Sequence, residues 1–107
     1  MLKIHRHCFT GDVNEYQQWK SAFPNCKFGI SPLIFRKREH FKKLFQEVPL
    51  EDLLLESDAP YITREHGGLG EPTLVKKVAV EIADLYGVPV KHVEKITSQT
   101  AAWIYSL

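Results

Sequence analysis

The chain has 107 residues, of which 44% are hydrophobic and 25% are charged, and its formal net charge is +1. This composition is typical of one globular domain and excludes a disordered or low-complexity chain. The sequence contains no apolar run of the roughly 18 residues that span a bilayer and no visible secretion signal, and its small net charge makes no general case for nucleic-acid binding. We therefore expect an intracellular protein, cytoplasmic or nuclear, without a membrane partner.

The first third of the chain predicts a strand, a helix and a second strand. Residues 2–9 alternate in a two-residue period, which predicts a strand with His5 and His7 on one face. Apolar residues then recur at three- and four-residue steps over residues 13–23, and Asp12 is a suitable N-cap for this helix. A short second strand is expected over residues 26–31.

A second helix is expected over residues 36–47, and a third strand follows it at Leu53–Glu56. The three consecutive leucines that begin this strand are the pattern of a strand covered on both faces, as in a parallel sheet. Acidic side chains follow at once, because Glu56 and Asp58 stand where the strand should end. The carboxyl ends of parallel strands are where functional side chains collect, so these carboxylates are placed for chemistry.

Two further helices are expected after a polar loop over residues 62–70. The first has an apolar stripe from Leu74 to Ala83, and Gly87 stands where a C-terminal cap belongs. The second runs over residues 90–105, with a break near Thr97. Its inward side chains are expected to be Val93, Ile96 and Trp103.

This order of elements predicts three parallel strands in sequential order, joined by right-handed crossovers, with the helices on one side. A (β/α)8 barrel takes about 250 residues, so the chain has room for about three of the eight units. His7 and Asp58 both fall at the carboxyl ends of predicted strands and are expected on one rim, where an imidazole and a carboxylate suit a divalent ion. On spacing alone, histidines satisfied by structural hydrogen bonds are an equal alternative.

Two motifs make the chain recognisable. The stretch HCFTG at residues 7–11 and the stretch LLESDAPY at residues 54–61 resemble the C-terminal part of the TatD family of metal-dependent deoxyribonucleases. The resemblance continues through Glu71 and Pro72, with Gly70 in place of the family's Asn, and through the C-terminal segment to Leu107. It covers essentially the whole chain, which would then be a single partial domain over residues 1–107.

The resemblance implies an α/β fold, in which the chain supplies about strands six to eight of a TIM-type (β/α)8 barrel with their helices. It implies that His7 is a metal ligand, that Asp58 is a ligand or the base that activates water, and that Arg64 contacts a substrate phosphate. The cofactor would be a divalent metal ion, Mg²⁺ or Zn²⁺, and the substrate would be DNA. Glu56 matches the family motif but is assigned no chemistry, and His5 is not the family ligand although it shares the strand face of His7.

The family's remaining metal ligands have no counterpart in these 107 residues. The resemblance therefore implies an incomplete C-terminal fragment that is inactive on its own, whose exposed sheet edge and helix flank favour self-association. The alternative is a non-catalytic α/β product that acts as a protein-interaction module. A metal hydrolase of the same barrel type that acts on amides is a third reading, which only the specificity of the two motifs disfavours.

Overall fold

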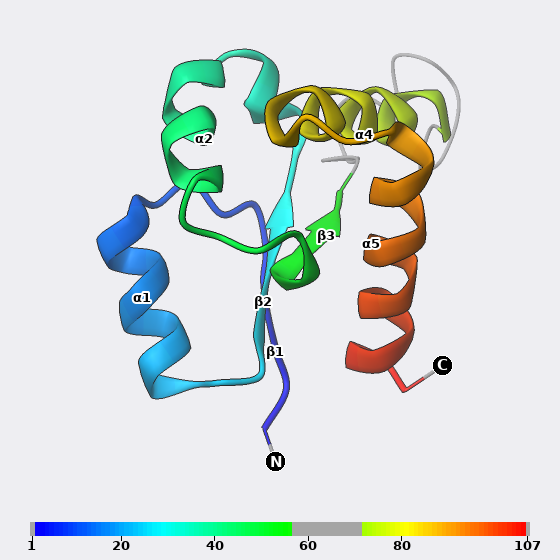
Figure 1. The fold of residues 1–107 in the computed structure, drawn as a ribbon. Coiled ribbons are helices and arrows are strands. Elements are labelled where there is room, and N and C mark those ends of the chain that lie inside the picture. The colour runs from blue at the N-terminus through cyan, green and yellow to red at the C-terminus, as the bar shows by residue number, and fades with distance from the viewer. Residues whose placement is uncertain (1, 57–71, 107) are drawn as a thin grey trace, which may run out of the picture.

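The computed structural model describes residues 2–56 and 72–106 (Figure 1). Its strands are β1 (Ile4–Arg6), β2 (Cys26–Ile30) and β3 (Leu53–Leu55). Its helices are α1 (Val13–Ala22), α2 (Arg38–Phe45), α4 (Pro72–Tyr86) and α5 (Val90–Ile104), with short 3-10 helices η1 (Pro32–Phe35) and η2 (Leu50–Asp52). Each expected strand and helix is present, whereas η1 and η2 were not expected. None of the helices described is long and apolar enough to cross a membrane.

The three strands form one parallel sheet in the order β1-β2-β3. Ile4 pairs with Cys26 in the first ladder, and Phe28 pairs with Leu53 in the second. Parallel neighbours need crossover connections, which here contain α1 and α2 (Figure 1). The N-cap of α1 is Asp12, whose side chain accepts a hydrogen bond from the Glu15 N–H. The parallel and sequential sheet confirms the prediction.

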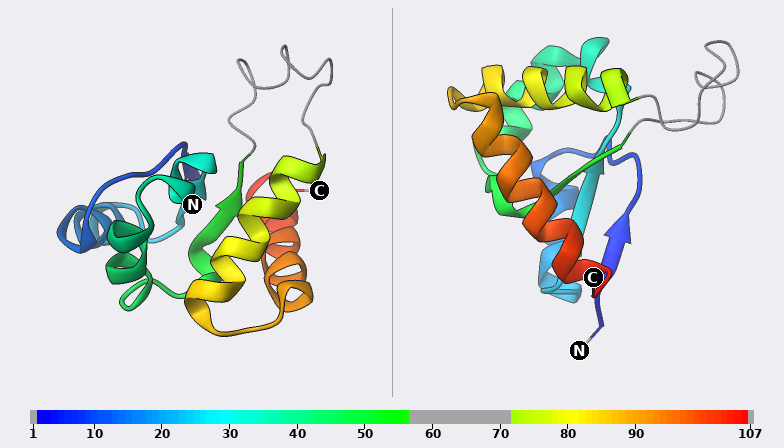
Figure 2. Two further views of the ribbon diagram at one scale, coloured as in Figure 1. Left: turned by 90° about the horizontal axis from the view of Figure 1, so that it is seen from above. Right: turned by 90° about the vertical axis from the view of Figure 1, so that its right-hand side faces the viewer.

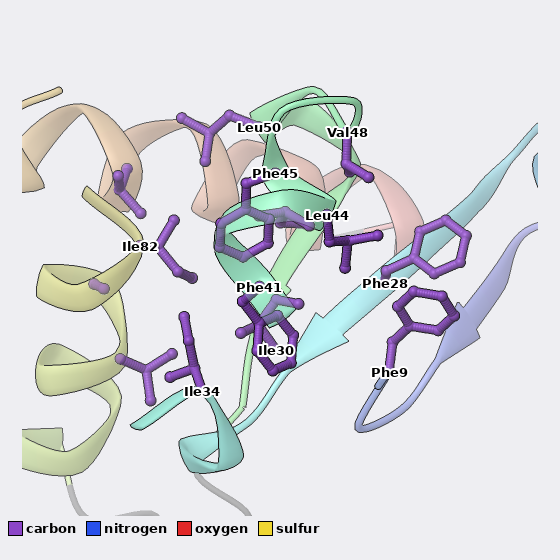
Figure 3. Packing of buried hydrophobic residues seen from close by; sticks show 14 of the residues in the cluster. Phe9, Phe28, Ile30, Ile34, Phe41, Leu44, Phe45, Val48, Leu50 and Ile82 are labelled. Atoms are coloured by element: carbon purple, nitrogen blue, oxygen red, sulfur yellow. The ribbon is translucent and has the colours of Figure 1, made fainter. Parts of the chain in front are cut away.

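One face of the sheet, the core face, packs against α1, α2 and α4. Side chains alternate along a strand, and Cys26, Phe28 and Ile30 all point to this face and are fully buried. The Phe28 ring lies 4.7 Å from the ring of Phe9 and 5.0 Å from that of Tyr16, measured between centroids (Figure 3). The same buried cluster includes Ile34, Phe41, Leu44, Phe45, Val78 and Ile82. This core holds β2 rigidly in the middle of the sheet.

The opposite face, the site face, carries His5, Lys27, Gly29 and Leu54. Figures 1 and 2 show α5 on this side of the strands, across the sheet from α1 and α2. The Lys27 ammonium lies 5.2 Å from the centroid of the Trp103 ring of α5, and Leu54 is buried. The prediction that the helices lie on one side is therefore wrong. The physical reason is that Leu54 makes the site face apolar along β3, and an amphipathic helix can cover it there.

The course of α5 also differs from expectation. The helix is continuous through Thr97, whose hydroxyl donates to the Val93 carbonyl at 2.8 Å instead of breaking the helix. Its buried residues are Val93, Thr97, Thr100 and Ile104. Trp103 was expected to point inward but is 39% exposed. The buried stripe thus contains two threonines whose hydroxyls are satisfied by backbone carbonyls, which hydrophobic periodicity alone does not reveal.

Candidate functional site

A cluster of polar side chains lies where the strands of the sheet end, and Glu56 is at its centre. Glu56 directly follows β3, and its backbone N–H donates to the Ile30 carbonyl at 2.9 Å, which continues the ladder by one bond. The Glu56 Oε2 atom lies 2.7 Å from His5 Nε2 and 3.0 Å from His7 Nδ1. The Glu56 side chain is 13% exposed. A largely buried carboxylate therefore joins the ends of β3 and β1.

The backbone of Cys8 completes the environment of this carboxylate. Residues 2–9 were expected to form one strand, but β1 ends at Arg6, and Cys8 has a φ of 47°. This left-handed conformation is rare for a residue with a Cβ and is found where the surrounding structure requires it. Here it directs the Cys8 N–H to Glu56 Oε1, at 2.8 Å. The residues that follow the shortened strand thus supply a backbone donor to the site.

Gly29 of β2 provides the space in which the Glu56 side chain lies. A Cβ atom built on Gly29 would lie 1.9 Å from Glu56 Oε2 and 2.8 Å from His5 Nε2. Both separations are far below van der Waals contact, so any other residue would displace the carboxylate or the imidazole. Glycine weakens a strand interior and often marks a close approach of another group, which is its role here.

The hydrogen bonds of the cluster keep the carboxylate charged. Burial on its own would raise the pKa of Glu56, but hydrogen bonds from His5 and from the Cys8 N–H, together with the attraction of the imidazoles in their protonated form, bring the pKa below its ordinary value. The rings of His5 and His7 are stacked with their centroids 3.7 Å apart, which confirms that they share a face. The His5 Nδ1 atom also contacts the hydroxyl of Tyr105.

The cluster has the donor atoms of a divalent-metal site. His5, His7 and Glu56 each offer one ligand atom, and these three atoms lie within 4.8 Å of one another. Imidazole nitrogens with a carboxylate oxygen are ligands of zinc and of other transition metals. His7 is open to a ligand because its side chain is 71% exposed, whereas that of His5 is only 12% exposed. The donor set therefore fits a metal ion at the His7 side of the cluster.

The family follows from comparison with known sequences. The sequence model of a family described as TatD related DNase matches residues 1–106. The chain belongs to this TatD family. It is 30% identical over 103 residues to an uncharacterized metal-dependent hydrolase, YabD, of Bacillus subtilis, covering 94% of this chain and 40% of the relative. It is 27% identical to the human 3'-5' RNA nuclease TATDN2, covering 98% of this chain and 15% of that protein.

The fold of this TatD-family chain is also found in solved structures. The crystal structure of an uncharacterized amidohydrolase from Saccharomyces cerevisiae matches with a TM-score of 0.75 at 20% identity, covering 95% of this chain and 40% of that one. At this identity the likeness concerns the fold alone, and it does not favour amide substrates. Together with the parallel β1-β2-β3 sheet, it shows the α/β fold of part of a (β/α)8 barrel, as expected. The chain spans two fifths or less of these proteins.

The central residues of the cluster are not the ones to which the motifs gave a role. His7 lies in the cluster, whereas Asp58 and Arg64 lie outside the described residues. Glu56, to which the motif reading gave no chemistry, makes the central contacts, and His5 is its closest side-chain partner. Sequence reasoning also missed Gly29, although an isolated glycine in a predicted strand is a usable signal.

Proposed function

We propose that this chain is the C-terminal part of a metal-dependent nuclease of the TatD family, which hydrolyses phosphodiester bonds in DNA. The observation that carries the proposal is the contact between Glu56 and His7. A carboxylate that holds one nitrogen of an exposed imidazole leaves the other nitrogen aimed outward, and this is how proteins orient metal-binding histidines. Membership of a family described as TatD related DNase supports DNA as the substrate class.

Each residue then has a distinct role. His7 binds the metal through its outer nitrogen, and Glu56 fixes the direction of that ring. Asp58, two positions beyond Glu56, is the second ligand or accepts a proton from the attacking water, and Arg64 contacts a phosphate of the substrate. A divalent ion at this position supplies Lewis acidity toward a phosphoryl oxygen and lowers the pKa of water. Imidazole ligation favours Zn²⁺ over Mg²⁺.

The 107-residue chain is proposed to bind metal weakly and to lack nuclease activity by itself. His7 and Asp58 supply two ligands, whereas a catalytic zinc site uses three protein ligands and an open position. The remaining ligands would come from the part of the relatives that the chain does not match, since it covers 40% of YabD. Activity belongs to a longer protein with the preceding strand-helix units.

Metal titration and a nuclease assay test this proposal. Zn²⁺ and Mg²⁺ are titrated into the 107-residue chain by calorimetry. Release of nucleotides from DNA and RNA oligonucleotides is measured for the chain and for a longer protein that carries the preceding units. We expect weak Zn²⁺ binding and no activity from the chain, and metal-dependent DNA cleavage by the longer protein.

Three substitutions sharpen the assay. In the longer protein, Asp58→Asn should abolish cleavage and His7→Ala should weaken Zn²⁺ binding, each without loss of the fold by circular dichroism. His92→Ala is the matched control, because His92 is exposed on α5 and lies outside the cluster. Near wild-type turnover by a folded Asp58→Asn protein would refute the proposed site. Preferred cleavage of RNA would refute the substrate assignment while leaving the metal centre in place.

The alternative function is a protein-interaction module, and one observation favours it. In the described part of the chain, β1 and β3 each pair on one side only, with β2. An unpaired strand edge can add a strand from another chain. A monodisperse complex of the 107-residue chain with itself or another protein, in the absence of any metal binding, would support this reading over the nuclease.

A further inference from the structure

The structure assigns to Tyr105 the role of a positioning residue. Its hydroxyl fixes the tautomer of His5, and His5 in turn holds the Glu56 carboxylate against Nδ1 of His7. This inference deepens the proposed function, on which its relevance to metal binding rests. The contacts concerned link the end of α5 to β1, β1 to the end of β3, and the end of β3 to His7 just after β1. Tyr105 touches His5, His5 touches Glu56, and Glu56 touches His7.

The end of α5 is fastened to β1, which keeps the Tyr105 side chain in place. The Lys3 ammonium donates to the Trp103 carbonyl at 2.7 Å and to Ser106 Oγ at 3.4 Å. A cation at the last carbonyls of a helix satisfies groups that have no partner within the helix. The same ammonium lies 4.8 Å from the centroid of the Trp103 ring. The Tyr105 ring then meets the His5 ring edge-on, with 5.9 Å between centroids.

The chemistry of the donors assigns the protons. An ionised carboxylate only accepts hydrogen bonds, so His5 Nε2 must carry a proton to bond with Glu56 Oε2. In the neutral imidazole the other nitrogen, Nδ1, is then an acceptor, and the Tyr105 hydroxyl donates to it. By the same argument His7 carries its proton on Nδ1, which faces Glu56, and its Nε2 keeps a lone pair.

This assignment separates the two histidines by role. Both nitrogens of His5 are engaged, so His5 has no lone pair for a cation and serves to orient Glu56. The lone pair of His7 Nε2 lies on the exposed side chain and is available to a metal ion. Tyr105 therefore acts on the metal site through His5 and Glu56, without touching the ion. Tyr105 as a whole is 53% exposed, so burial in the core does not account for the direction of its hydroxyl.

Nuclear magnetic resonance tests the assignment. Long-range proton–nitrogen correlations of the ¹⁵N-labelled chain, recorded near pH 8, show which nitrogen of each ring carries the proton. We expect the Nε2–H form for His5 and the Nδ1–H form for His7. In Tyr105→Phe, which keeps the ring but removes the donor, the His5 signals should shift to exchange between the two tautomers. Zn²⁺ affinity should fall about tenfold, as for loss of other groups that orient a ligand.

Two further variants exclude a general effect on the fold. Tyr86→Phe removes another phenol hydrogen bond, to the Val48 carbonyl, and should leave both imidazole signals unchanged. In a His5→Leu background Tyr105→Phe should have no further effect on Zn²⁺ affinity, because the effect passes through His5.

A proton on His5 Nδ1 in the wild-type chain overturns the inference, and so do His5 signals that are identical in folded Tyr105→Phe. The histidine signals are recorded without metal, so they test the role of Tyr105 independently of the proposed function. If Zn²⁺ does not bind at all but Tyr105→Phe changes the His5 tautomer, the positioning of His5 stands and the proposed function fails.

Discussion

The two ends of β3 each carry a carboxylate with little exposure to solvent, and the surroundings of the two are opposite in kind. Asp52 directly precedes the strand and is 5% exposed. It accepts from the Tyr16 hydroxyl at 2.6 Å and lies 3.0 Å from the Lys27 ammonium and 3.3 Å from that of Lys20. Glu56 directly follows the strand, and its partners are two imidazoles and one backbone N–H.

We propose that this difference separates a structural carboxylate, Asp52, from a functional one, Glu56. Lysine is a cation at neutral pH, so Lys20 of α1 and Lys27 of β2 neutralise the charge of Asp52. The carboxylate oxygens of Asp52 are occupied by these lysines and by the Tyr16 hydroxyl, which leaves neither oxygen for a ligand. Burial and the hydrogen bond to Asp52 also raise the pKa of Tyr16, which keeps that donor protonated. An imidazole that is held through one nitrogen can bind a metal ion through the other, so the His7 side of the Glu56 cluster can still take a ligand. The following substitutions test whether the two ends differ in this way.

The largest effect is expected for Asp52→Ala. The substitution leaves the Lys20 and Lys27 ammonium groups, both largely buried, without their counterion, and breaking such a pair costs about 3 kcal/mol. Urea unfolding followed by circular dichroism measures the loss. Asp84→Ala, which removes an exposed carboxylate paired with Arg38, is the control and should cost at most about 1 kcal/mol. Equal losses for the two variants would show that Asp52 is not a structural anchor.

A smaller loss of about 2 kcal/mol is expected for Gly29→Ala, because the new methyl group would overlap the Glu56 carboxylate. The matched control is the same substitution in a Glu56→Ala background, where the overlapping atoms are gone. There Gly29→Ala should cost much less, and the difference is the coupling energy between the two positions. Equal costs in both backgrounds would mean that Gly29 is not required by the site.

Glu56→Gln should affect metal binding more than stability. The amide can still accept a hydrogen bond from His7 but has lost the charge that makes this ring a good ligand, so Zn²⁺ affinity should fall about tenfold, or about 1.4 kcal/mol. Calorimetric titration of Zn²⁺ measures the change. Glu47→Gln removes an exposed carboxylate from the end of α2 and should leave the affinity unchanged. A Glu56→Gln chain that binds Zn²⁺ as tightly as wild type would show that the charge of Glu56 does not support metal binding.

Periodicity predicted the strands, the helices and their parallel order, because these depend on residues near one another in the chain. It could not predict that α5 covers the site face, since an amphipathic helix does not specify which surface it meets. The motifs identified His7, but the role of Glu56 depends on a contact with His5 across 51 residues of sequence. The left-handed Cys8 and the space at Gly29 follow from that contact, so neither was visible before the strands were placed. The roles of His7, Asp58 and Arg64 stay predictions.

The smallest expected effect is a change of the unfolding free energy at acid pH. The pKa of Glu56 is lower in the folded chain than in the unfolded chain, so between these two values the unfolded state binds more protons and acid favours unfolding. The stabilising contribution of Glu56 is complete above the ordinary glutamate pKa of about 4.3 and is lost as the pH falls through the lower folded value. We therefore expect the difference in unfolding free energy between metal-free wild type and Glu56→Gln to shrink from about pH 5 to about pH 3. A wild-type advantage over Glu56→Gln that persists or grows on acidification would show that the imidazoles and the Cys8 N–H do not hold the carboxylate in its charged form.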